Sequence, residues 1–168
     1  MNIIEAFEYY DKHINRQERF KLLLIHKLRV PGSIHSIDWE LFGSILTGDI
    51  GKYGYGSDLT NHEVKSAKEG SAFEYQYHLN TGEIKLRDDK SVEHIFISYS
   101  PDYKNVVVRK VAGYELADIF ASWEEGLRAN YTGSTRKQRF RRSISYQTIV
   151  KKGEIVMQIK NCQLIVSG

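Results

Sequence analysis

Apolar residues recur at three- and four-residue spacing over the first fifty positions, a period that is typical of amphipathic helices. The spacing predicts one helix from Ile3 and a second that begins at Asn15 and ends before Pro31. A third helix is expected over residues 37–50, with Ser36 as its cap. The N-terminal part of the chain should therefore be helical.

The middle of the chain changes to short segments rich in β-branched and aromatic residues, which favour strands. We expect strands at residues 62–67, 72–79, 83–87, 92–99 and 104–111. Asn80-Thr81-Gly82 has the composition of a hairpin turn. The segments 92–99 and 104–111 are apolar enough to be central strands with both faces covered.

A further helix is predicted over residues 114–129, where apolar residues form one stripe. After a basic segment, strand-like runs follow at residues 144–150, 155–159 and 164–166. The order predicts an α/β (α+β) fold in which helices flank a central mixed sheet. Its 168 residues suit one domain, with a helical part (1–50), a sheet core (51–130) and a basic C-terminal part (131–168).

Composition is that of a globular chain, with 41% hydrophobic and 27% charged residues. No apolar run approaches the ~20 residues needed to cross a bilayer, and the N-terminus lacks the pattern of a secretory signal. The single Cys162 cannot form an internal disulfide. These features predict a cytoplasmic protein without a membrane partner.

The charge is unevenly distributed along the chain. Residues 1–127 contain 15 Lys and Arg against 20 Asp and Glu, whereas residues 128–168 contain 9 against 1. A segment this basic commonly binds a polyanion, because Lys and Arg contacts to phosphates release counterions.

One acidic and basic cluster carries candidate chemistry. Glu63 and Lys65 are two positions apart on a predicted strand, so both should emerge on one exposed face while Val64 points into the core. Asp58 has the wrong parity for an unbroken strand, so a turn or bulge near Thr60-Asn61 is needed to bring it to Glu63.

If the two carboxylates converge, their hard oxygens suit Mg²⁺. Lys65 could then orient or deprotonate an attacking water and offset the charge of a phosphorane, while the metal polarises the phosphate. This arrangement indicates phosphodiester hydrolysis.

The segment resembles the PD-(D/E)xK nucleases, and among them the type II restriction endonucleases. Asp58 matches the first acidic position and Glu63-Val64-Lys65 matches the (D/E)xK tripeptide, while Ser57 stands where the family has Pro. The strict motif covers residues 58–65, and the order of elements agrees over residues 37–130.

The resemblance implies a restriction-endonuclease-like core, Mg²⁺-dependent cleavage of double-stranded DNA at a specific sequence, and a homodimer. It also implies a further acidic residue from the preceding helix, a position that Glu40 occupies. A prokaryotic host and a DNA methyltransferase acting on the same site would accompany such an enzyme.

The basic C-terminal segment mixes cations that contact phosphates with side chains that can read base edges. The candidate DNA-binding residues are Arg136, Lys137, Gln138, Arg139, Arg141 and Arg142. Two other functions stay open at this point. One is a junction-resolving or repair nicking nuclease of the same superfamily, and the other is a non-catalytic nucleic-acid-binding module.

Overall fold

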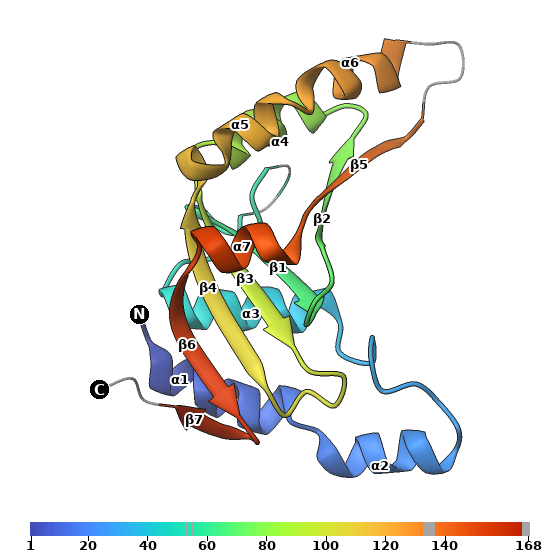
Figure 1. Cartoon of the computed structure of the whole chain (residues 1–168), viewed down its shortest axis with the longest axis vertical. Coiled ribbons are helices and arrows are strands. Elements are labelled where there is room, and N and C mark those ends of the chain that lie inside the picture. Colours follow the sequence, from blue (N-terminus) through green and yellow to red (C-terminus); the bar gives the residue numbers. More distant parts are fainter. Residues whose placement is uncertain (53, 55, 133–136, 166–168) are drawn as a thin grey trace.

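The computed structural model describes residues 1–52, 54, 56–132 and 137–165 and has a mixed α/β architecture (Figure 1). Its central sheet has the strand order β1-β3-β4-β6-β7, in which β1 and β3 are parallel and the other neighbours are antiparallel. These strands are β1 (His62–Lys68), β3 (Glu93–Tyr99), β4 (Val106–Ala112), β6 (Glu154–Lys160) and β7 (Gln163–Ile165). The expected mixed sheet is confirmed, and β1 is one of its edges.

A second, two-stranded sheet projects from the first. It pairs β2 (Phe73–His78) with β5 (Arg139–Ile144) in antiparallel register, although residues 79–138 separate the two strands in sequence. Figure 1 shows this ribbon rising beside the central sheet toward the helices α4 to α6. We call it the β2–β5 ribbon.

Helices cover both faces of the central sheet (Figure 1). They are α1 (Ile3–Tyr9), the π-helix η1 (Tyr10–Ile14), α2 (Gln17–Ile25), α3 (Ser36–Thr47), α4 (Gly82–Asp89), the 3-10 helix η2 (Gly113–Leu116), α5 (Ala117–Ala121), α6 (Glu124–Thr132) and α7 (Tyr146–Lys152). Within the described ranges, no helix is long and apolar enough to cross a membrane.

The sheet separates two hydrophobic cores. On one side, α1, η1 and α3 pack against alternate residues of the strands, including Val64 of β1 and Ile95 of β3. On the other side, the β2–β5 ribbon and the helices α4 to α7 enclose Phe96 of β3 together with Tyr75 and Tyr77 of the ribbon. Consecutive residues of β3 therefore enter different cores, as expected for a strand covered on both faces.

The segment 83–87, predicted as a strand, is instead part of α4. A strand was expected from composition, but Ile84 is the one β-branched residue of this segment and is 49% exposed, whereas Leu86 is buried (2% exposed). Glu83 in the first turn and Arg87 in the last turn complement the helix dipole. Residues 80–82 consequently connect β2 to a helix and do not form a hairpin turn.

Of the strand expected over 144–150, residues 146–150 are helical, while Ile144 is the last residue of β5. Ser145 caps α7, because its side-chain oxygen accepts a hydrogen bond from the Thr148 amide at 3.1 Å. The single helix expected over 114–129 is divided between η2, α5 and α6, with breaks around Ser122 and Trp123. Three of the basic residues, Arg139, Arg141 and Arg142, belong to strand β5.

The N-terminal helices differ from the prediction mainly at their ends. The second helix begins at Gln17, not at Asn15, because a π-helix occupies the turns before it. It ends at Ile25, several residues before Pro31. The third helix is confirmed as α3, but His35 is its cap residue and Ser36 is its first helical residue. The Asp38 carboxylate closes the first turn by accepting a hydrogen bond from the His35 amide at 3.2 Å.

Candidate active site

The edge strand β1 carries the predicted (D/E)xK tripeptide. Glu63 and Lys65 lie on one side of β1, and Val64 enters the core beneath α3, as the alternation predicted. His62 lies on the opposite side from Glu63, with its Nδ1 atom 2.8 Å from Asp49 Oδ2. One expectation was wrong, because Glu63 is not exposed but fully buried beneath the loop before β1 and α4.

A turn before β1 brings Asp58 to the tripeptide, as its parity required. The Leu59 amide donates to the His62 carbonyl at 2.9 Å, which reverses the chain over Thr60 and Asn61. Asp58 Oδ2 then accepts a hydrogen bond from the Val64 amide at 3.1 Å, and the Asp58 amide donates to Glu63 Oε2 at 3.0 Å. These two bonds fix both carboxylates relative to the strand.

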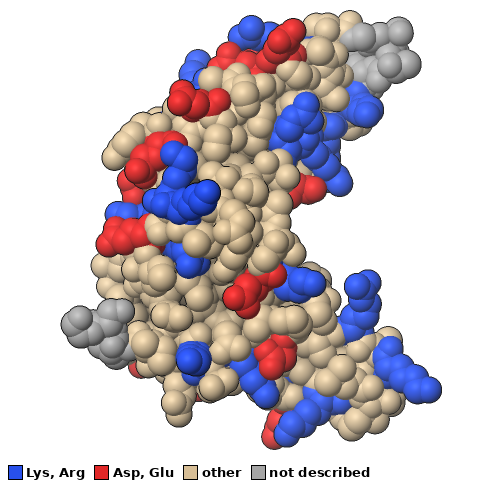
Figure 2. Space-filling model, viewed as in Figure 1, with Lys and Arg blue, Asp and Glu red and all other residues tan. Residues whose placement is uncertain are grey.

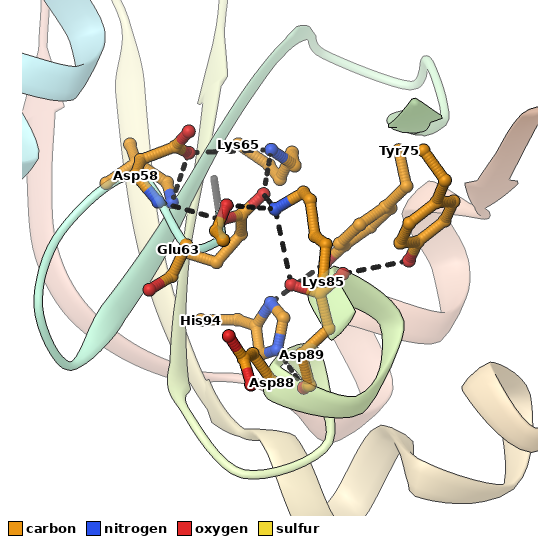
Figure 3. A network of polar contacts seen from close by, with 12 residues as sticks. Asp58, Glu63, Lys65, Tyr75, Lys85, Asp88, Asp89 and His94 are labelled. Atoms are coloured by element: carbon orange, nitrogen blue, oxygen red, sulfur yellow. Dashed lines mark hydrogen bonds and ion pairs between the residues drawn. The ribbon is translucent and has the colours of Figure 1, made fainter. Parts of the chain in front are cut away.

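Lys65 joins the two carboxylates. Its ammonium lies 3.5 Å from Asp58 Oδ2 and forms an ion pair with Glu63 Oε1. Figure 3 shows the three side chains pointing toward one another at the end of β1. One cation thus contacts both acidic groups, so the convergence predicted from the sequence is present.

A second lysine, which the sequence analysis did not identify, reaches the same carboxylate from α4. Lys85 Nζ lies 2.6 Å from Glu63 Oε1, 3.1 Å from the Gly56 carbonyl and 3.4 Å from Asp89 Oδ1. Figure 3 shows Lys85 approaching Glu63 from the side opposite Lys65. Lys85 and Asp89 have the i, i+4 spacing of a helical ion pair, a signal that appears only once the segment is assigned to a helix.

The two ammonium groups determine the ionisation of Glu63. Burial opposes its ionisation, but Lys65 and Lys85 outweigh burial and lower the pKa of Glu63 to about 2. Burial would lower the pKa of Lys65, whereas the Glu63 and Asp58 carboxylates raise it above its usual range. Burial, together with the charge of Glu63, raises the pKa of Asp58. At neutral pH, Lys65 is therefore an ammonium and Glu63 a carboxylate.

Behind Lys85, the network continues into the β2–β5 ribbon. The Tyr77 hydroxyl donates to Asp89 Oδ2 at 2.8 Å, and burial followed by the charge of Glu63 raises the pKa of Asp89 to about 7. His94 Nε2 lies 2.7 Å from the Asp89 carbonyl and His94 Nδ1 lies 2.9 Å from the Tyr75 hydroxyl. Burial lowers the pKa of His94 to about 4.

Tyr75 also lies beside the other lysine of the site. The Lys65 ammonium is 5.2 Å from the centre of the Tyr75 ring.

Glu40 lies on α3 at the side of this cluster, as the resemblance implied. Burial raises the pKa of Glu40, the negative charge of Asp58 adds to the increase, and Lys65 opposes it. Glu40 and Lys65 line a small pocket of about 150 Å³ together with Trp39, Ser66 and Glu74. Glu40 is thus close enough to interact electrostatically with the cluster.

The carboxylates suit a hard divalent cation in their chemistry, since both offer oxygen ligands and already share one cation. Within the described part of the chain, no group of three His, Cys, Asp or Glu side chains is arranged to hold a metal. Glu63 Oε1 and Oε2 already accept bonds from Lys65, Lys85 and the Asp58 amide. Mg²⁺ would therefore bind through Asp58 and Glu63 with waters as its other ligands, and it would compete with Lys65 for these oxygens.

The candidate DNA-binding residues divide between two sides of the β2–β5 ribbon. Arg139 and Arg141 pair with His78 and Gln76 on the outer side, where all four side chains are exposed. Arg142 is on the side of the buried tyrosines, and its guanidinium lies 4.2 Å from the centre of the Phe140 ring.

Lys137 and Gln138 are exposed residues just before β5, whereas Arg136 lies outside the described residues. On the outer side of the ribbon, the cations of Arg139 and Arg141 therefore lie beside the Gln76 amide and the His78 imidazole.

No protein-family model matches the chain, and a search of curated proteins finds no match. The resemblance to the PD-(D/E)xK nucleases therefore rests on the residues of the motif between Asp58 and Lys65.

Proposed function

We propose that this protein is a Mg²⁺-dependent endonuclease that hydrolyses phosphodiester bonds of double-stranded DNA at a specific sequence, in the manner of a type II restriction endonuclease. The observation that carries the proposal is the contact of one ammonium, that of Lys65, with the carboxylates of both Asp58 and Glu63. Three residue types that phosphodiester hydrolysis needs are thus gathered at the edge strand of a mixed sheet.

In the proposed reaction, Asp58 and Glu63 would hold Mg²⁺, and a bound Mg²⁺ would supply Lewis-acid polarisation of the scissile phosphate. Lys65 acts as a charged donor that orients the attacking water and offsets the negative charge of the phosphorane. The raised pKa of Lys65 favours this role over removal of a proton from the water, because the side chain stays protonated at neutral pH. Glu40 would add a third carboxyl group at the side of the site, where burial and the charge of Asp58 raise its pKa.

The surface of the molecule supports DNA as the substrate. The molecule is hollowed on the side where α2 and the β2–β5 ribbon project, and Lys and Arg side chains gather on both arms of the hollow (Figure 2). A two-stranded antiparallel ribbon fits the major groove, and Arg and Gln are the side chains that read guanine and adenine there. Arg141 pairs with Gln76 on the outer side of this ribbon.

We further propose a homodimer, because cleaving both strands of a duplex requires two sites and each chain contributes one candidate active site. A two-fold dimer on a palindromic sequence would place one site on each strand. Sedimentation of the protein with a duplex containing its site should give a complex of two chains per duplex. A complex of one chain would instead favour a nicking nuclease.

The decisive experiment is digestion of unmethylated phage DNA with Mg²⁺, followed by separation of the products. Discrete fragments that vanish when EDTA replaces Mg²⁺ would support the proposal, whereas intact DNA at all divalent-ion concentrations would contradict it. Lys65→Met should abolish cutting, and Lys68→Met is its matched control, because Lys68 ends the same strand with an exposed side chain.

The alternative functions give different outcomes in the same experiment. A junction-resolving or repair nuclease would leave linear duplex intact but cut branched or mismatched DNA in Mg²⁺. A non-catalytic binding module would retard the duplex in a gel without cutting any of these substrates. In either nuclease, Lys65→Met should remove cleavage and leave retardation unchanged, which would assign the cleavage to this site.

A further inference from the structure

The Lys85 ammonium has its three hydrogen-bond acceptors on three different segments around the candidate active site. Glu63 is on β1, the Gly56 carbonyl is in the loop that carries Asp58, and Asp89 is on α4 with Lys85 itself. An ammonium has three protons, so these contacts use its full donor capacity. Within the described residues, Lys85 therefore has no proton left for a substrate, and these three contacts are all with parts of the site.

Through Asp89, Lys85 is also connected to the β2–β5 ribbon, which we propose binds DNA. Asp89 accepts from Lys85 through Oδ1 and from the Tyr77 hydroxyl through Oδ2, so one carboxylate orients the ammonium and is itself oriented by the ribbon. Tyr77 faces inward from β2, between the outward-facing residues Gln76 and His78. A continuous chain of polar contacts thus runs from the ribbon through Asp89 and Lys85 to Glu63.

We propose that Lys85 is a positioning residue for the nuclease: its ammonium holds the Glu63 carboxylate and the Asp58 loop in their working arrangement, and Asp89 and Tyr77 hold the ammonium. The inference rests on the function proposed above. Figure 3 shows the geometry on which it stands, with the Lys85 ammonium between Glu63 of β1 and Asp89 of α4. Catalysis is sensitive to such placement, because a displacement of about 1 Å can cost about 100-fold in rate.

The same contacts would form if Lys85 only stabilised the fold by pairing with the buried Glu63 carboxylate. The test must therefore separate an effect on the position of Glu63 from an effect on stability. The Asp58 amide supplies a local probe, because it donates to Glu63 Oε2. If Lys85 orients Glu63, Lys85→Met should increase hydrogen exchange of the Asp58 amide in NMR without metal. It should also lower the single-turnover cleavage rate about 100-fold, while the affinity for duplex in EDTA changes less than about twofold.

The orienting chain is tested with a double-mutant cycle. Tyr77→Phe removes the hydroxyl that holds Asp89 and should slow cleavage about tenfold in the wild-type background. In the Lys85→Met background it should have little effect, because Tyr77 acts through Lys85. Tyr131→Phe is the matched control: the Tyr131 hydroxyl contacts the same ribbon through the Tyr77 carbonyl and the Phe140 amide, but it does not contact Asp89.

The outcomes separate the two proposals. A wild-type protein that cuts, with Lys85→Met cutting equally fast, would overturn the positioning role and leave the nuclease intact. Equal effects of Tyr77→Phe in both backgrounds would overturn the chain through Asp89. If the wild type does not cut, the nuclease proposal fails, and amide exchange at Asp58 alone decides whether Lys85 holds Glu63. Should Lys85→Met fail to fold, Tyr77→Phe and Asp89→Asn must both accelerate that exchange, and Tyr131→Phe must not.

Discussion

Glu63 Oε1 accepts from two lysines at once, Lys65 of its own strand and Lys85 from the helix that follows the ribbon strand β2. Because Glu63 is fully buried, neither water nor a distant charge can replace these partners. Removing one partner of such a cluster leaves a buried charge undercompensated. Substitutions here must therefore be judged by folding as well as by activity.

The first prediction concerns the two ion-paired residues of β1. Glu63→Gln and Lys65→Met should each lower the cleavage rate by about 10³-fold, because each removes charge stabilisation in a site sheltered from water. Binding to duplex DNA in EDTA should stay within about threefold of wild type. Single-turnover cleavage and fluorescence anisotropy measure the two quantities. Equal cleavage by Lys65→Met and the exposed control Lys68→Met would contradict the assignment of Lys65.

A second prediction follows from the opposite pKa shifts of Asp89 and His94. Asp89 ordinarily titrates at 3.8 and here at about 7, so between these values the folded state holds a proton that the unfolded chain releases. Its contribution to the free energy of unfolding therefore falls as pH rises. His94 ordinarily titrates at 6.5 and here at about 4, so the unfolded chain binds the additional proton and its contribution rises with pH.

The two contributions offset each other in the wild type between pH 4.5 and 6.5. Asp89→Asn should make the free energy of unfolding rise with pH across this interval, and His94→Gln should make it fall. Between pH 4.5 and 6.5, the free energy of unfolding of each variant should change by about 2 kcal/mol relative to that of the wild type. Urea unfolding at several pH values measures it. Parallel curves for the wild type and both variants would show that neither group titrates as the buried network requires.

A third prediction concerns the contact between α3 and β1. A Cβ atom at Gly43 would lie 2.7 Å from Val64 Cγ2 and 3.1 Å from Val64 Cγ1, so Gly43→Ala should cost about 1–3 kcal/mol through overpacking. Gly51→Ala is the control, because no atom of the described residues outside its chain neighbours lies within 4 Å of the added Cβ. Thermal and urea unfolding measure both. Adding Val64→Ala should reduce the penalty specifically in the Gly43→Ala background, and a failure to do so would exclude this contact as its cause.

Strand alternation was enough to predict that Glu63 and Lys65 share one side of a strand and that Asp58 needs a turn to join them. The sequence could not show that Glu63 is buried, because burial depends on α4, which packs over it from a later position. The segment 83–87 was assigned to a strand from its composition, and this assignment concealed the helical pair of Lys85 and Asp89. Short segments with few apolar residues are compatible with either period.

The ribbon was equally hard to predict from sequence, since its strands β2 and β5 are far apart along the chain and pair only through tertiary packing. The basic residues were visible in the composition, but their division between two sides of β5 depends on the register with β2. That register places Phe140 opposite Tyr77 in the core and turns Arg139 and Arg141 outward. A one-residue shift would reverse this arrangement.

The last prediction uses this division of the arginines. Arg139 and Arg141 lie on the outer side of the ribbon, so each that contacts a phosphate should, when changed to Ala, weaken binding to all sequences and reduce the salt dependence by about one unit. An arginine that reads a base should instead relax specificity at one position, at a cost of about 1–3 kcal/mol there. Arg142→Ala is the matched control, because Arg142 is on the same strand but packs over Phe140. Salt titrations with cognate and altered duplexes distinguish these cases. If Arg142→Ala lowers the salt dependence as much as Arg139→Ala and Arg141→Ala do, the outer side of the ribbon is not the DNA-contacting surface, and the basic segment acts only through its total charge.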